Sequence, residues 1–269
     1  MKKVLIASSL LISLGALGHE FWLQPSRFFV RPGDEISLQV LVGEHFSGER
    51  SEGKKNRIIS YRHHAATGTA DITPTLTGDT YSDVLVSLNT EGTHLFTFMN
   101  TPKFLSMKAD SFLLYLQEDG LDNIITARQQ QGESNKPSRE LYQRCAKSLV
   151  QVGDTPDRTF SKNTGMTLEI IPAKNPYTQR FGQTAEFKIL FMDKPLEGAL
   201  VRYWNRNATN QTLEEKQRTN ALGDVSFRLR PGRNMVSVVH MVPAKDTTQT
   251  RYGSADWHSY WGSLTFGSR

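Results

Sequence analysis

The residue with the clearest capacity for chemistry is His19, because it follows a segment typical of an export signal. Two lysines precede an apolar run that starts at Val4, and the run ends in a small-x-small sequence at residues 16–18. Cleavage after Gly18 would free an α-amine on His19, and this amine and the ring Nδ1 can close a six-membered chelate ring around a cation. Nitrogen donors of this kind suit Cu(II), Ni(II), Co(II) and Zn(II).

The apolar run before His19 is shorter than the roughly 20 residues of a bilayer-spanning helix. We therefore expect residues 1–18 to be a signal peptide and the mature chain to be soluble and periplasmic in a Gram-negative cell. A cut after Gly15 is the alternative, and it would leave His19 fourth in the chain and abolish the chelate. The single cysteine, Cys145, can form no internal disulfide.

The charge of the chain gives no indication of a nucleic-acid partner. The formal net charge is +5, and it falls to +3 when Lys2 and Lys3 leave with the signal. This excess is small and spread along the chain, and no aromatic RNA-binding motif or basic arm accompanies it.

The elements that must position His19 are mostly short β-type runs separated by Gly, Pro, Asp or Asn. This pattern predicts a mainly β protein built from antiparallel β-sandwiches. The exception is residues 110–131, where Phe112, Tyr115 and Leu116 recur at helical spacing and predict a short helical insertion. The predicted strands are Ser26–Val30, Glu35–Val42, Arg57–His63, Tyr81–Leu88, His94–Met99, Thr167–Ile171, Thr184–Met192, Ala199–Trp204, Val225–Leu229 and Met235–Val242.

The polar stretch Val152–Gly165 is the best candidate for a domain linker. We expect an N-terminal β-sandwich-like domain with the helical insertion at residues 19–155 and a C-terminal immunoglobulin- or prealbumin-like sandwich at 166–269. Residues 139–150 fit a helix or a strand, because Leu141, Cys145 and Leu149 satisfy both spacings.

Two other histidines could join His19 in a site. His240 alternates with valines on one strand face, and His94 shares a face with Phe96 and Phe98. Each pattern also suits a structural histidine in the core. The sequence contains no metal-hydrolase signature, nucleophile elbow, phosphate-binding loop or dinucleotide fingerprint, so motifs give no support for an enzyme.

Several longer motifs span the whole mature chain. They are His19-Glu20-Phe21-Trp22-Leu23-x-Pro25, Phe112-Leu113-Leu114-Tyr115-Leu116-x-Glu118-x-Gly120-Leu121, Arg139-Glu140-x-Tyr142-x-Arg144-x-x-Lys147, Val239-His240-Met241 and Asp256-Trp257-x-Ser259-Tyr260-Trp261-x-x-Leu264-Thr265-Phe266. With this order and spacing the chain resembles the bacterial "domain of unknown function 4198" family. The resemblance implies a β-rich periplasmic component associated with nickel or cobalt uptake.

The resemblance implies a site that contains His19 and His240, and we add His94 as a third possible metal ligand. Asp256 or Glu140 would accept a ring N–H and fix its tautomer. Tyr142 and Trp261 would wall the site and exclude water. We expect Arg139 to form a buried ion pair with Glu140 that holds the helical insertion to the sheets.

The predicted function is a periplasmic binding protein for a divalent transition metal, nickel, cobalt or copper, taken up as the ion or as a small complex. A metal permease is a possible partner. One alternative is a metal-free carrier or interaction module. Another is a copper-dependent oxidase of the N-terminal-histidine type, with Trp22, Trp257 and Trp261 as its substrate face.

Overall fold

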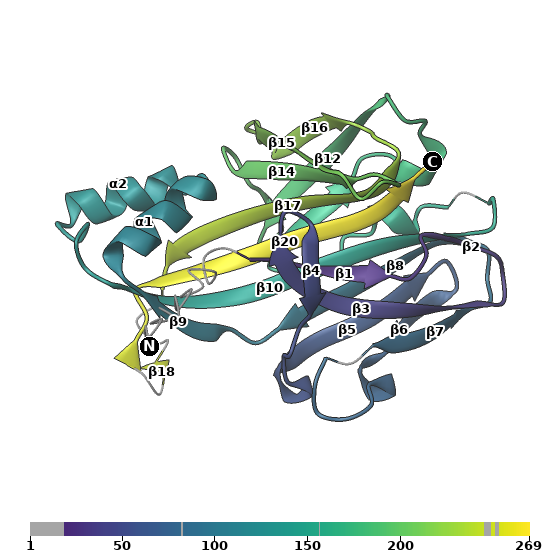
Figure 1. The fold of residues 1–269 in the computed structure, drawn as a ribbon, viewed down its shortest axis with the longest axis horizontal. Helices are drawn as coiled ribbons and strands as arrows, with labels where there is room; N and C mark the ends of the chain where they lie inside the picture. The colour runs from purple at the N-terminus through teal and green to yellow at the C-terminus, as the bar shows by residue number, and fades with distance from the viewer. Residues whose placement is uncertain (1–18, 82, 156, 245–248, 251–252) are drawn as a thin grey trace, which may run out of the picture.

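The computed structural model describes residues 19–269 apart from 82, 156, 245–248 and 251–252 (Figure 1). The predicted signal peptide at residues 1–18 lies outside the described residues. The residues in these ranges are mainly β and include two α-helices, which confirms the predicted fold class at that level. No helix in the described ranges combines the length and apolar character needed to cross a bilayer.

The central layer is a ten-stranded sheet that runs through both halves of the chain. Its eight main strands follow one another in space, and β2 (Phe29–Val30) and β9 (Lys103–Met107) also pair with β10. The spatial order is β15 (Thr212–Arg218), β14 (Leu200–Arg206), β17 (Gly232–Pro243), β20 (Trp257–Ser268), β10 (Ser138–Val152), β8 (Gly92–Asn100), β5 (Ile58–Ala65) and β6 (Gly68–Asp71).

Two outer sheets cover opposite faces of the central sheet. The first contains β1 (Glu20–Pro25), β3 (Asp34–Glu44), β4 (Ser47–Arg50) and β7 (Val84–Leu88). The second contains β11 (Leu168–Pro172), β12 (Thr184–Phe191), β13 (Lys194–Pro195) and β16 (Asp224–Arg228). A separate hairpin joins β18 (Gln249–Thr250) to β19 (Gly253–Ser254), and four short 3-10 turns lie at Lys55–Arg57, Thr73–Thr75, Thr159–Ser161 and Pro176–Thr178.

Alternation along β10 sends its side chains into two separate cores. Ala146 and Val150 pack with Phe21 and Leu23 of the first outer sheet. Leu149 and its odd-numbered neighbours pack instead with β11 and β12 of the second outer sheet. The face a residue occupies on β10 or on a paired strand therefore decides which layer it can contact.

The helical insertion consists of α1 (Ala109–Glu118) and α2 (Asp122–Gln130) and confirms the helix predicted from residues 110–131. Figure 1 shows both helices beside one end of β17, β20 and β10. The buried residues of α1 are Phe112, Tyr115 and Leu116, and they pack with Trp257 and Trp261 of β20. Gly120, with a φ of +65°, ends the first helix in the left-handed conformation that favours glycine.

Residues 139–150, for which helix and strand were both open, belong to the long strand β10. This strand pairs in parallel with β20 over nine positions, from Glu140 with Trp257 to Ser148 with Thr265. The two halves on either side of Val152–Gly165 therefore share one sheet. The boundaries predicted for two domains stay a prediction.

Candidate functional site at the start of strand β1

His19 lies directly before β1, and the pairing of β1 with β3 places it opposite Glu44. The register joins Glu20 to Gly43, so the next pair outward is His19 with Glu44. The His19 Nε2 atom lies 3.1 Å from the Glu44 Oε1 atom, and the His19 side chain keeps 34% of its surface exposed. A carboxylate beside one ring nitrogen is the arrangement that orients metal-binding histidines.

Arg144 of β10 binds the main chain of His19. Its Nη1 donates a 2.8 Å hydrogen bond to the His19 carbonyl oxygen. The guanidinium lies over the Trp261 ring at 4.4 Å and over the Tyr142 ring at 5.2 Å. Burial lowers the pKa of Arg144 from its ordinary value, with nearby tyrosines and carboxylates opposing that effect. The predicted wall residues Tyr142 and Trp261 therefore contact this cation.

A second buried cation, Arg202 of β14, connects the start of β1 to the end of α1. Arg202 pairs with Asp119 and lies 3.9 Å from Glu20 and 3.1 Å from Glu214. Desolvation raises the pKa of Glu20 to about 7 and that of Asp119 to about 6, although Arg202 lowers both. These carboxyl groups hold their protons near neutral pH more tightly than ordinary acids do.

Glu140 lies beneath the helical insertion and is completely surrounded by protein. Its Oε1 accepts hydrogen bonds from Ser259 and, at 3.2 Å, from the Tyr115 hydroxyl. Ser259 in turn accepts a 3.1 Å hydrogen bond from the Trp261 indole. Desolvation raises the pKa of Glu140 to about 7 against the opposing effect of these hydrogen bonds. Glu140 therefore binds side chains of the helix–sheet contact and accepts no imidazole N–H.

The expected ion pair between Arg139 and Glu140 does not form. Adjacent residues on a strand point to opposite faces, and only Glu140 points toward α1. Arg139 pairs instead with Asp256, with its Nε 3.1 Å from Oδ2, and both side chains are partly exposed. Asp256 is thus a partner of Arg139 and not of a histidine.

His240 lies on the other face of the central sheet. It pairs with Tyr260 in the register of β17 and β20, and its ring packs edge-on against Phe191 of the second outer sheet at 4.4 Å. Desolvation lowers the pKa of His240 to about 4. The structure therefore separates His240 from His19 by the thickness of the sheet.

His94 shares the face of His19 but lies far along it. It pairs with Val150, six residues along β10 from Arg144, which is about 20 Å at the rise of a strand. Its Nδ1 lies 2.7 Å from His63 Nε2, and its Nε2 donates a 2.8 Å hydrogen bond to the Thr90 carbonyl. His94 is thus a buried histidine with both ring nitrogens engaged.

The three predicted ligands, His19, His94 and His240, are not brought together. The described part of the chain contains no group of three or more His, Cys, Asp or Glu side chains arranged to hold a metal ion. Any metal at His19 would depend on the two nitrogens of that one residue after cleavage, with Glu44 beside the ring. Trp22, Trp257 and Trp261 are also buried, so they form no exposed face for a glycan.

Sequence reasoning missed Arg144, Glu20 and Arg202, although two of these residues lie inside the motifs. The available signal was a run of charged residues within a strand otherwise rich in apolar side chains. Arginine and glutamate are rarely buried without partners, so a charged residue at a core position predicts a buried network.

A family model described as "Domain of unknown function (DUF4198)" matches residues 16–242. No curated protein matches the chain.

Two solved structures resemble the chain weakly. "Three N-terminal domains of the bacteriophage RB49 Highly Immunogenic Outer Capsid protein (Hoc)" is 6% identical, with a TM-score of 0.22 over 93% of this chain and 71% of that chain. A "tetra-tandem repeat in extending region of large adhesion protein" is 12% identical, with a TM-score of 0.20 over 93% of this chain and 50% of that chain. At these TM-scores neither structure bears on the fold or function.

Proposed function

Since the chain belongs to the DUF4198 family, described as a domain of unknown function, we propose a function from the geometry of its own residues. It is an exported protein that binds a divalent transition metal, copper, nickel or cobalt, through His19. The observation that carries the proposal is the way His19 is held. Glu44 lies beside Nε2, and Arg144 binds the carbonyl oxygen, so the ring nitrogen that remains for a chelate with the residue's own amine is Nδ1.

The chemistry requires cleavage after Gly18. The freed amine and Nδ1 then supply two nitrogens in a five-atom span that closes a ring with the metal. Copper is favoured by intrinsic affinity among the divalent ions of the first row. With only two donors from the chain, the remaining positions are filled by water or by ligands that arrive with the ion, so a small metal complex is a suitable form of the cargo.

Restricted movement of His19 is what distinguishes this site from any free N-terminal histidine. A rigid main chain lowers the entropy lost on chelation, and the Glu44 carboxylate beside Nε2 fixes the orientation of the ring. We place the protein in the periplasm, with a metal permease as its partner. We also propose an immunoglobulin- or prealbumin-like sandwich for each half of the chain.

The experiment begins with mass spectrometry of the exported protein, which should give a mature chain starting at His19. Calorimetric titration of that protein with Cu(II), Ni(II) and Co(II) should show one site. His19→Ala should abolish it. Acetylation of the His19 α-amine keeps the ring and Glu44 but removes the amine donor, and it should also abolish the site.

His240→Ala is the matched control, because that imidazole lies on the opposite face and should leave the affinity unchanged. If the acetylated chain binds metal as tightly as the natural mature chain, the amine takes no part and the proposal is wrong. If no metal binds to the natural mature chain, the proposal is also wrong. The metal-free carrier or interaction module then becomes the proposed function.

A further inference from the structure

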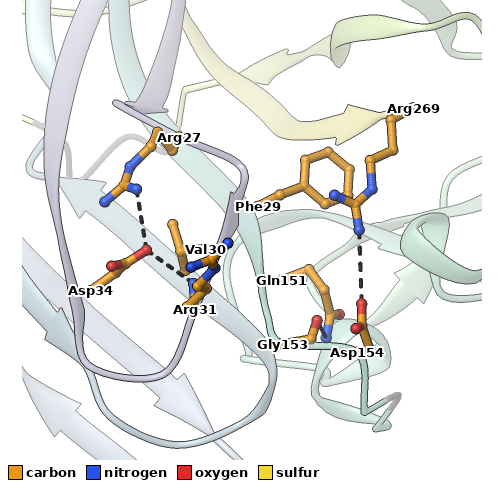
Figure 2. Close-up of a pocket in the computed structure, with 9 residues that line it drawn as sticks. All are labelled: Arg27, Phe29, Val30, Arg31, Asp34, Gln151, Gly153, Asp154 and Arg269. Carbon is orange, nitrogen blue, oxygen red and sulfur yellow. Dashed lines mark hydrogen bonds and ion pairs between the residues drawn. The ribbon is translucent and has the colours of Figure 1, made fainter.

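A polar hollow lies at the other end of β1 from His19, where the chain turns through β2 into β3. Its volume is about 480 Å³, within the range of small-molecule sites. Figure 2 shows the hollow between the turn that carries Arg27, Arg31 and Asp34 and the two segments after β10 and β20 that carry Asp154 and Arg269. The remaining lining residues are Phe29, Val30, Gln151 and Gly153.

Arg27 and Asp34 already form an ion pair with each other inside the hollow. Arg27 Nη1 lies 3.1 Å from Asp34 Oδ2, and the same oxygen accepts a 3.0 Å hydrogen bond from the Arg31 main-chain N–H. These contacts lower the pKa of Asp34, the Arg31 hydrogen bond most of all, so Asp34 is ionised at neutral pH. The charges of Arg27 and Asp34 therefore cancel and hold the turn in shape.

The guanidinium groups of Arg31 and Arg269 have no hydrogen-bonded carboxylate partner of this kind among the described residues. Arg31 has no carboxylate within ion-pair distance among the described residues. Arg269 lies over the Phe29 ring at 4.3 Å, and its Nη2 lies 3.8 Å from Oδ1 of the exposed Asp154, beyond hydrogen-bond distance. Stacking on an aromatic ring fixes the plane of the Arg269 guanidinium and leaves its N–H edge available.

We propose that this hollow binds a small molecule that carries two or more carboxylate or phosphate groups. Guanidinium groups bind such oxyanions through paired N–H···O contacts, which are stronger than neutral hydrogen bonds. Arg31 and Arg269 come from opposite sides of the hollow, so a ligand with two separated anionic groups satisfies both at once. A neighbouring hollow of about 570 Å³ shares Arg27 and Phe29 and adds Arg233, which gives room for the rest of the ligand.

The test uses the full mature chain, freed of metal by a chelator, so that its result is independent of the His19 proposal. Calorimetric titration at fixed sodium chloride concentration compares citrate, inorganic phosphate, acetate and uncharged glycerol. Citrate should bind as a single molecule per chain, and acetate and glycerol should give no saturable heat. Inorganic phosphate carries one anionic group and should bind more weakly than citrate; tighter binding of phosphate than of citrate would overturn the requirement for two separated groups.

Arg31→Gln and Arg269→Gln should each weaken citrate binding about tenfold, the effect of losing a hydrogen-bonded charge pair. Arg62→Gln removes the same charge from an exposed position on β5 outside both hollows and should leave the affinity unchanged. Equal weakening by all three substitutions would mean non-specific attraction and would overturn the proposal. Absence of saturable binding of citrate and phosphate below about 1 mM would overturn it as well.

Discussion

Lys147 and Glu169 form an ion pair of 2.7 Å in which both side chains are almost completely buried. Lys147 projects from the central strand β10, and Glu169 belongs to β11 of the second outer sheet. Glu169 also accepts hydrogen bonds from the main chain of Thr164 and Met166, at 2.8 and 3.2 Å. The pair therefore joins the central sheet to an outer sheet and to the segment that leads into it.

Removing the cation from this pair should be strongly destabilising. Lys147→Met leaves the Glu169 charge buried without compensation, which typically costs about 3–5 kcal/mol of unfolding free energy. Urea denaturation followed by circular dichroism measures the loss. The double variant Lys147→Met/Glu169→Gln removes both charges but keeps the acceptor oxygen, and it should recover much of the stability. A single variant as stable as wild type would show that the charge is not buried in solution.

Substitution of Arg144 should affect both stability and metal binding. Arg144→Lys keeps the charge but loses the planar group that lies over Trp261, so we expect a loss of roughly 1–2 kcal/mol in unfolding free energy. The hydrogen bond to the His19 carbonyl is also weakened, and Cu(II) affinity should fall about tenfold. Calorimetry and urea denaturation give the two values. Unchanged affinity in a destabilised variant would limit Arg144 to a structural role.

Glu140 should make the protein less stable as the pH rises. Its folded pKa is about 7, above the ordinary 4.5, so the folded state holds the proton more tightly than the unfolded chain. The resulting stabilisation is complete below pH 4.5 and is lost as the pH rises through 7, by up to about 3 kcal/mol. Glu140→Gln should reduce the slope in urea denaturation between pH 4.5 and 8, and the part due to Glu20 and Asp119, whose pKa values are raised to about 7 and about 6, should remain. The exposed control Glu49→Gln should keep the wild-type slope.

His240 should have the opposite pH dependence. Its folded pKa is about 4, below the ordinary 6.5, because its half-buried ring resists protonation beside Phe191. The unfolded chain takes up this proton first, so stability falls as the pH drops from 6.5 toward 4, by about 2 kcal/mol. His240→Phe should reduce the slope of that part of the profile and leave Cu(II) binding intact, and the loss due to His63 and His64, whose pKa values are also lowered to about 4, should remain. A steeper acid loss in the variant would contradict this interpretation.

The elements with strong periodicity could be predicted from the sequence alone. The helical spacing of Phe112, Tyr115 and Leu116 was sufficient for the insertion, and most β-branched runs became strands close to the predicted bounds. Strand β10 could not be settled because Leu141, Cys145 and Leu149 are four residues apart, which suits one helix face and one strand face equally. The buried charged residues of β10 also interrupt the alternation of apolar and polar side chains that identifies a strand.

The arrangement of the histidines could not be predicted, because it depends on the register between distant strands. A shift of one residue exchanges the two faces of a strand. The motif that contains His240 gives no indication that the register with β20 turns this ring toward Phe191 and away from His19. The contact of His19 with Arg144 could not be predicted for the same reason, since 125 residues separate the two in sequence.

The place of β20 between β17 and β10 has a consequence for biogenesis. β20 follows every other strand of the central sheet in the sequence, yet it fills the middle of the sheet. Until residues 257–268 emerge, β17 and β10 each lack the neighbour that completes their hydrogen bonding. The exposed edges of β17 and β10 can pair with other chains until then, and a chaperone that covers strand edges would have its greatest effect in that interval.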